Sequence, residues 1–221
     1  MKDKINFGDL RRVTPISRAF GFERGRPVDR YYIESFLAEN AAEIAGRVLE
    51  VGDDQYTQEF GGSRVTQADI IDLKADNPKA TLIADLTQAD HLGGNLFDCF
   101  IFTQTLQFLY DVRAAIGTAY RILKPGGVLL ASFPVISQIC RYDMDRWGDY
   151  WRFTNASVLR LLSEQFPQEQ IQVRAHGNIL TAICIMHGLA AEELTSEELD
   201  YHDPDYQIVI TARAVKPVEA G

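Results

Sequence analysis

Acidic side chains follow several short apolar segments of the sequence. Residues 47–56 read RVLEVGDDQY, a short apolar strand that ends in Glu-Val-Gly and continues with two more acids. We expect the next two strands to end at Asp69 and Asp85. Carboxyl ends of parallel strands meet at one edge of a sheet, where ligands bind at the topological switch point. A phosphate-binding turn would carry more glycine, so these acids favour a ligand without phosphate.

The residue types at these strand ends suit a positively charged nucleoside. A carboxylate at Asp69 can accept hydrogen bonds from two ribose hydroxyls, and Asp85 can accept from an adenine amino group. Gly52 has no side chain, so a ligand can approach its backbone closely. Glu50 either contacts the amino group of the ligand or pairs with an arginine such as Arg30. S-adenosylmethionine, with its sulfonium and amino groups, fits this description.

A second candidate region is residues 141–153, RYDMDRWGDYWRF, which we expect to form a loop. Aromatic faces with interleaved acids suit a sugar or an aromatic alcohol. Three acids could also hold a divalent metal, but a lid tied down by its own Arg–Asp pairs is the favoured interpretation, and we predict no metal site. The candidate substrate-binding residues are Tyr142, Trp147, Tyr150, Trp151 and Arg152.

Two residues are candidates for a general base. His176 ends a predicted strand just before Gly177, and a histidine titrates near neutral pH. Asp149, in the aromatic segment, is the second candidate. His187 lies in an apolar stretch and is expected to be a core residue.

The elements that must position these residues alternate between strands and helices. Strands are expected at residues 46–52, 63–71, 80–86, 97–106, 128–134, 170–177 and 206–215, and helices at 29–44, 112–123, 155–166 and 178–194. The fourth strand is apolar nearly throughout, which suits a parallel strand covered on both faces. The pattern predicts an α/β fold with a mostly parallel, doubly wound sheet.

Composition narrows the class of protein. The 221 residues carry a net charge of −9, which argues against a nucleic-acid partner. No stretch reaches the ~20 apolar residues of a membrane span, and the N-terminus lacks a signal-like apolar core, so we expect a cytoplasmic protein. We predict a single domain over residues 1–221, with an arm or lid (1–28), a cofactor-binding core (29–135) and a substrate-side region (136–221).

Five segments together resemble a known family. They are VLEVG (48–52), VTQADI (65–70), ADLTQAD (84–90), FDCFIFTQTLQFLYD (97–111) and AYRILKPGGVLLASFP (119–134). In their joint spacing they resemble class I S-adenosylmethionine-dependent methyltransferases of the methyltransferase domain 11 kind. The sequence departs from the family at GDDQYTQEFGG, where Gly-x-Gly-x-Gly is usual, and at Phe108, where a histidine is common.

The resemblance implies a Rossmann-like sheet of seven strands with an antiparallel last strand. It also implies methyl transfer from S-adenosylmethionine, with S-adenosylhomocysteine as product. The expected cofactor-binding residues are Glu50, Gly52, Asp53, Asp69, Ile70, Asp85, Leu86, Thr103, Gln104 and Tyr31. Segments 20–37 and 141–154 further resemble a subgroup found with glycosyltransferases and natural-product pathways. O-methylation of a sugar, glycan or natural-product hydroxyl is therefore the expected reaction.

Other interpretations stay open. The altered glycine turn is compatible with a methyltransferase fold that binds or regulates without catalysis, and the acceptor atom could be nitrogen or carbon. A nicotinamide enzyme is disfavoured because no dinucleotide glycine fingerprint is present. The arm and the apolar helix near residues 179–191 are compatible with a homodimer.

Overall fold

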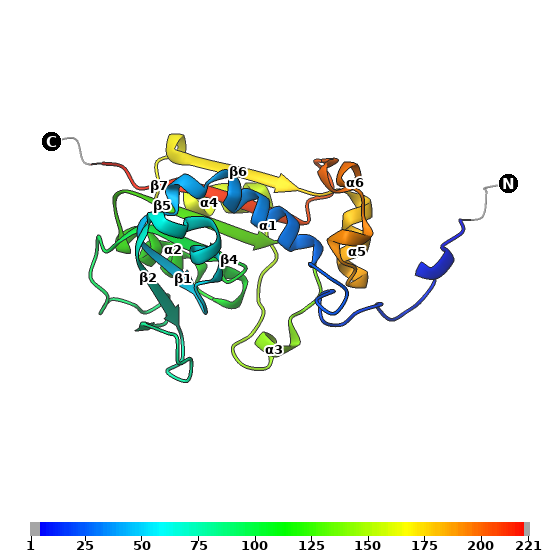
Figure 1. The fold of residues 1–221 in the computed structure, drawn as a ribbon, viewed down its shortest axis with the longest axis horizontal. Helices are drawn as coiled ribbons and strands as arrows, with labels where there is room; N and C mark the ends of the chain where they lie inside the picture. The colour runs from blue at the N-terminus through cyan, green and yellow to red at the C-terminus, as the bar shows by residue number, and fades with distance from the viewer. Residues whose placement is uncertain (1–4, 219–221) are drawn as a thin grey trace.

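The computed structural model describes residues 5–218, which form a seven-stranded sheet between two layers of helices (Figure 1). The strand order is β3-β2-β1-β4-β5-β7-β6. The strands are β1 (Gly46–Val51), β2 (Val65–Asp72), β3 (Leu82–Ile83), β4 (Phe97–Thr103), β5 (Leu123–Pro134), β6 (Ile171–His176) and β7 (Val209–Val215). β7 runs antiparallel to both β5 and β6, and the other pairs are parallel. The predicted fold class is confirmed.

Alternation along the central strands sends side chains into two separate cores. In β4, Phe100 and Phe102 pack in one core, and Cys99 and Ile101 pack in the other. The first core is covered by α2 (Val112–Ile122) and α4 (Asn155–Leu162). The second is covered by α1 (Val28–Glu39), α5 (Ile179–His187) and α6 (Ser196–Asp200). The apolar β4 sequence therefore reflects a strand buried on both faces.

The connection between β1 and β2 contains no long helix. Residues 53–64 form a π-helical turn (Thr57–Gly61) and a 3-10 turn (Gly62–Arg64). A side chain at Gly61 would place its Cβ 2.4 Å from Val65 Cγ2, so this glycine permits the close return into β2. The segment that departs from the glycine-rich family pattern is thus a compact helical turn.

Several predicted helix boundaries are wrong: α1 ends at Glu39 and α4 at Leu162, before the predicted ends at residues 44 and 166. α5 ends at His187, because Gly188 adopts a left-handed conformation (φ 67°) and its Cβ would meet the Ser17 carbonyl oxygen at 2.7 Å. The N-cap of α4 is Thr154, whose side chain accepts from Ser157 N, and Asn155 is the first helical residue.

The N-terminal arm reaches the body near the end of α5. The backbone N–H groups of Ile16 and Ser17 both donate to the His187 carbonyl, and residues 5–15 extend away from the sheet (Figure 1). α1 follows the arm directly and begins at Val28. Between residues 5 and 218, no helix has the length and apolarity to cross a membrane.

Candidate functional site

A cleft lies at the carboxyl ends of β1 and β2, beside the ends of β3 and β4. Its lining includes Gly52, Asp72, Asp85 and Thr105, and we call it the strand-end cleft. β1 and β4 are adjacent in the sheet although β2 and β3 separate them in the sequence, so the chain reverses its direction of winding here. This is the switch point at which open α/β sheets bind ligands.

Gly52 gives the cleft an open backbone surface. Its φ is 82°, and a Cβ added there would meet no atom within 4 Å. Asn77 Nδ2 donates to both the Gly52 carbonyl (2.7 Å) and Asp72 Oδ2 (2.8 Å). Asn77 therefore ties the end of β1 to the end of β2 and fixes the Asp72 carboxylate beside the exposed backbone.

The prediction that the second strand ends at Asp69 is wrong. β2 continues to Asp72, and the parallel register pairs Asp69 with Leu49, two residues before the end of β1. The Asp69 side chain accepts from Arg47 Nε (2.7 Å) and Thr81 Oγ1 (3.0 Å) and is only 6% exposed. It is an internal ion-pair partner outside the strand-end cleft. Asp72 has the position that was assigned to Asp69, and the apolar pair Ile70–Ile71 that precedes it is the sequence signal for a longer strand.

The other residues predicted near strand ends differ in how far they are buried and in whether they line the cleft. Asp85 lines the cleft, and its Oδ1 accepts from Thr87 N (2.8 Å) and Thr87 Oγ1 (2.7 Å). Thr103 ends β4, before the predicted end of that strand at residue 106, and its carbonyl accepts from Thr105 Oγ1. Ile70 and Leu86 are buried apolar residues that do not line the strand-end cleft.

Glu50 caps the helical turn that follows β1. Its carboxylate is buried and accepts from Tyr56 N (3.2 Å), Thr57 N (2.8 Å) and Thr57 Oγ1 (2.7 Å). Burial raises the pKa of Glu50 to about 7 despite these hydrogen bonds. Arg30 donates instead to the Tyr56 hydroxyl. Asp53, predicted as a cofactor ligand, is exposed, and its Oδ1 accepts from Gln55 N.

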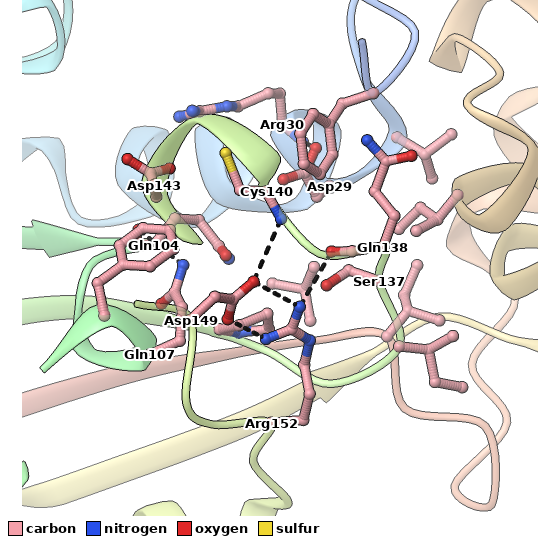
Figure 2. Close-up of a pocket in the computed structure, with 18 of the residues that line it drawn as sticks. Asp29, Arg30, Gln104, Gln107, Ser137, Gln138, Cys140, Asp143, Asp149 and Arg152 are labelled. Atoms are coloured by element: carbon pink, nitrogen blue, oxygen red, sulfur yellow. Dashed lines mark hydrogen bonds and ion pairs between the residues drawn. The ribbon is translucent and has the colours of Figure 1, made fainter. Parts of the chain in front are cut away.

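A second cavity of about 270 Å³ adjoins the strand-end cleft, and we call it the inner cavity (Figure 2). Its walls come from the start of α1, the residues after β4 and β5, and the segment 136–152. Phe108 and Asp143 line both the cleft and the inner cavity, so the two spaces share a wall. Phe108 stands where the family that the sequence resembles commonly has a histidine. A ligand in the cleft and another in the inner cavity would both contact these two side chains.

Three carboxylates, those of Asp29, Asp143 and Asp149, line the inner cavity. Asp149 is paired with Arg152 through both oxygens (2.6 and 3.0 Å), and its side chain is 2% exposed. Asp29 has no ion pair with any residue between 5 and 218, and its Oδ1 accepts from Arg30 N (2.9 Å). Burial raises the pKa of Asp29, and the nearby Arg30 charge opposes that shift.

The Asp149–Arg152 pair closes the segment between residues 138 and 152. Arg152 Nη2 also donates to the Gln138 carbonyl (3.0 Å), and Asp149 Oδ2 accepts from Cys140 N (3.2 Å) (Figure 2). Within this segment α3 (Arg141–Met144) forms a single turn, where the sequence suggested only loop. The expected Arg–Asp pairs within this segment are therefore present.

The aromatic residues of this segment face the strand-end cleft more than the inner cavity. Trp147 and Tyr150 line the cleft, and the Tyr150 hydroxyl donates to the Trp147 carbonyl. Tyr142 is 62% exposed and packs edge-on against Trp147. Trp151 Nε1 donates to the Leu109 carbonyl. Of the predicted substrate-binding residues, only Arg152 lines the inner cavity.

The structure does not bring His176 or Tyr31 to either space. Both line a separate surface pocket between α1, β6 and α6. His176 Nε2 lies 2.8 Å from Thr211 Oγ1 and its ring packs on Tyr32, and burial lowers its pKa to about 4. The Tyr31 hydroxyl donates to Asp200. Gln104 was predicted for the cofactor but lines the inner cavity. Among residues 5–218, no cluster of three or more potential metal ligands is present.

Comparison with known proteins agrees with this geometry. Residues 45–131 match a family model described as a methyltransferase domain. The N-methyltransferase NodS from Bradyrhizobium japonicum WM9, solved with S-adenosylhomocysteine, is similar with a TM-score of 0.55 at 16% identity over 88% of this chain and 90% of that chain. A SAM-dependent methyltransferase from Archaeoglobus fulgidus is similar with a TM-score of 0.57 at 12% identity, over 90% of this chain and 100% of that chain.

The [4+2]-cyclase SpnF is similar with a TM-score of 0.57 at 17% identity, over 88% of this chain and 85% of that chain. A comparison with curated proteins gave no significant match. The solved structures establish the fold, and the family model covers the strand ends that build the cleft. Residues 45–131 thus resemble a methyltransferase domain, and the chain has the Rossmann-like fold of these solved structures.

Proposed function

We propose that the protein methylates a hydroxyl group of a small molecule held in the inner cavity. The small molecule is a sugar, a glycan or a natural product. The observation that carries the proposal is the wall of Phe108 and Asp143 shared by two cavities, one at the switch point and one beneath the segment 136–152. This arrangement would bring the two ligands to the same pair of side chains, next to each other. Exclusion of water and orientation supply much of the rate enhancement in such transfers.

The residues of the strand-end cleft fit S-adenosylmethionine. Asp72 and Asp85 both line this cleft, where Asp72 would accept hydrogen bonds from ribose hydroxyls and Asp85 from an adenine amino group. The open backbone of Gly52 permits close approach of the ligand. When bound, the cofactor supplies an electrophilic methyl group on a sulfonium. The chain must then hold the acceptor oxygen in line and take up its proton.

We assign to Asp29 the role of general base, which accepts the proton of the reacting hydroxyl. It lines the inner cavity, carries no ion pair, and has a pKa raised by burial, which makes it a better base than an ordinary carboxylate. Asp149 is less suited because Arg152 neutralises both of its oxygens. His176 lies in a different pocket.

A methyl-transfer assay tests the proposal. S-adenosylhomocysteine release is followed with S-adenosylmethionine and a panel of glycosides and phenols, for the wild type and for Asp29→Asn. We expect turnover with at least one hydroxyl acceptor and a loss of roughly 10²-fold or more in kcat for the variant, the usual contribution of a general base. Equal kcat in Asp29→Asn would remove that residue from the mechanism.

A binding or regulatory role is the second candidate. The amides of Tyr56 and Thr57, at the turn where the family usually has glycines, are already occupied by Glu50. Binding of S-adenosylmethionine without transfer to any acceptor of the panel would favour this role over the enzymatic one.

A further inference from the structure

Three phenylalanines, Phe20, Phe22 and Phe108, line the inner cavity. Phe22 is 60% exposed, and Phe20 and Phe108 are partly exposed, so each of them keeps surface that a ligand can contact. Between residues 5 and 218, none of the three rings packs against another aromatic ring. Aromatic side chains without a ring partner in a cavity favour a flat apolar ligand, which can stack on them or meet them edge to face.

Two of these phenylalanines come from the N-terminal arm, in a turn that is anchored to the end of α5. Ser17 N donates to the His187 carbonyl at 2.9 Å, and the buried Ser17 hydroxyl accepts from Gly21 N at 3.1 Å. A side chain at Gly21 would place its Cβ 2.8 Å from the Leu189 carbonyl oxygen, so this glycine lets the turn lie against the chain that follows α5. The turn is therefore held in place as one wall of the inner cavity.

Phe20 has a backbone conformation that phenylalanine does not favour. Its φ is 58°, in the left-handed region that a residue with a bulky side chain rarely adopts. Strained positions of this kind persist where surrounding contacts hold them, and they cluster at ligand-binding sites. Glycine would adopt this φ without strain, so the direction of the chain alone does not account for a phenylalanine here.

The acid–base chemistry of the cavity selects among hydroxyl acceptors. Asp29 lines the same cavity as the phenylalanines (Figure 2). Burial raises its pKa, but a carboxylate is still a weak base for the hydroxyl of an alkyl alcohol. A phenolic hydroxyl has a pKa of about 10 and gives up its proton much more readily. A phenol combines the flat ring that the phenylalanines suit with the hydroxyl that Asp29 suits.

We propose that Phe20, with Phe22 and Phe108, binds the ring of the acceptor, and that the acceptor is a phenol. The proposal rests on the proposed function, because it places the acceptor in the inner cavity. Phe108 also lines the strand-end cleft, so a ring held against it lies next to the cofactor position. Phe20 is then a specificity-determining residue that the N-terminal arm supplies.

Calorimetric titration of protein saturated with S-adenosylhomocysteine tests the proposal. The probes are 2-naphthol, decahydro-2-naphthol and methyl β-glucoside. Decahydro-2-naphthol has the carbon skeleton and the hydroxyl of 2-naphthol without its aromatic rings. We expect 2-naphthol to bind at least about fivefold more tightly than the saturated alcohol, because only the aromatic compound forms ring pairs with the phenylalanines. The glucoside should bind most weakly of the three.

The variant Phe20→Gly removes one ring and suits the φ of 58°, so the turn should keep its conformation. Its preference for 2-naphthol over the saturated alcohol should fall at least about twofold. A purely structural role would weaken the binding of both alcohols equally and leave this ratio unchanged. Phe7→Ala is the matched control and should keep the wild-type ratio, because Phe7 lies on the same arm, is 53% exposed and lines neither the cleft nor the inner cavity.

The assignment would be overturned by equal affinity of the wild type for 2-naphthol and the saturated alcohol, by tighter binding of the glucoside than of 2-naphthol, or by the wild-type ratio in Phe20→Gly. The first two comparisons use only the wild type, so they hold even if the variant does not fold. S-adenosylhomocysteine affinity is measured first for each protein. A wild type that does not bind it contradicts the proposed function, whereas normal cofactor binding with tighter binding of the glucoside contradicts only the phenol.

Discussion

Single carboxylates at this site differ in role because their surroundings differ. Glu50, Asp69 and Asp72 come from adjacent strands, yet one caps a helical turn, one pairs with an arginine, and one lines the cleft. Their residue types were readable from the sequence. Their roles depend on strand register, which moves a side chain along the sheet with each residue. A motif match placed Asp69 at the strand end, and the register places Asp72 there.

Glu50 should make stability depend on pH. Its pKa rises from 4.5 to about 7 on folding, so the folded protein holds this proton more tightly than the unfolded chain. Its contribution favours folding below about pH 4.5 and is lost as pH rises through 7. In urea unfolding, the stability at pH 5 relative to that at pH 8 should therefore be higher in the wild type than in Glu50→Gln.

His176 also makes stability depend on pH, and its contribution is the same in the wild type and in Glu50→Gln. Its pKa is lowered to about 4, so it acts in the opposite direction and costs stability as pH falls from 6.5 to 4. It is unchanged in Glu50→Gln, so the difference between the two proteins isolates Glu50. An identical pH effect in both proteins would show that Glu50 is not protonated in the folded state.

At the scale of elements, the sequence revealed least about the segment between β5 and α4. Its arginines and acids indicated a lid, but they do not say which acid pairs with which arginine. The structure selects Asp149 and Arg152, which also hold the backbone of Gln138 and Cys140. That choice depends on where β5 ends and α4 begins, which is set by the two cores and not by local residues.

Breaking the Asp149–Arg152 pair should destabilise this segment. The Asp149 side chain is 2% exposed and that of Arg152 is 29% exposed, so Asp149→Asn leaves a partly buried guanidinium without its countercharge. We expect a loss of about 1–3 kcal/mol in the free energy of unfolding, less than for a fully buried pair because Arg152 is partly solvated. Urea unfolding at constant pH measures it.

Asp145→Asn is the matched control in the same segment. Asp145 pairs with Arg141 on the surface, where the side chains are 59% and 71% exposed, and such pairs contribute little. If both variants were equally stable, the Asp149 pair would have no special part in holding the lid.

At the scale of the whole molecule, the fold class was readable because buried apolar strands recur along the chain and the spacing of five segments resembles a known family. The position of His176 was not readable in this way, because β6 lies at the far edge of the sheet, beyond the antiparallel β7. A residue near a strand end in the sequence can therefore lie in another pocket. The inner cavity was equally hidden, since it is assembled from α1, the turn after β4 and the segment 136–152.

The cofactor position at the strand-end cleft is the central claim, and calorimetric titration with S-adenosylhomocysteine tests it most directly. The wild type should bind, Asp72→Asn should bind at least about tenfold more weakly because a charged acceptor for ribose hydroxyls is lost, and Asp69→Asn should keep wild-type affinity even if it is less stable. The reverse order, with affinity lost in Asp69→Asn and kept in Asp72→Asn, would contradict the account.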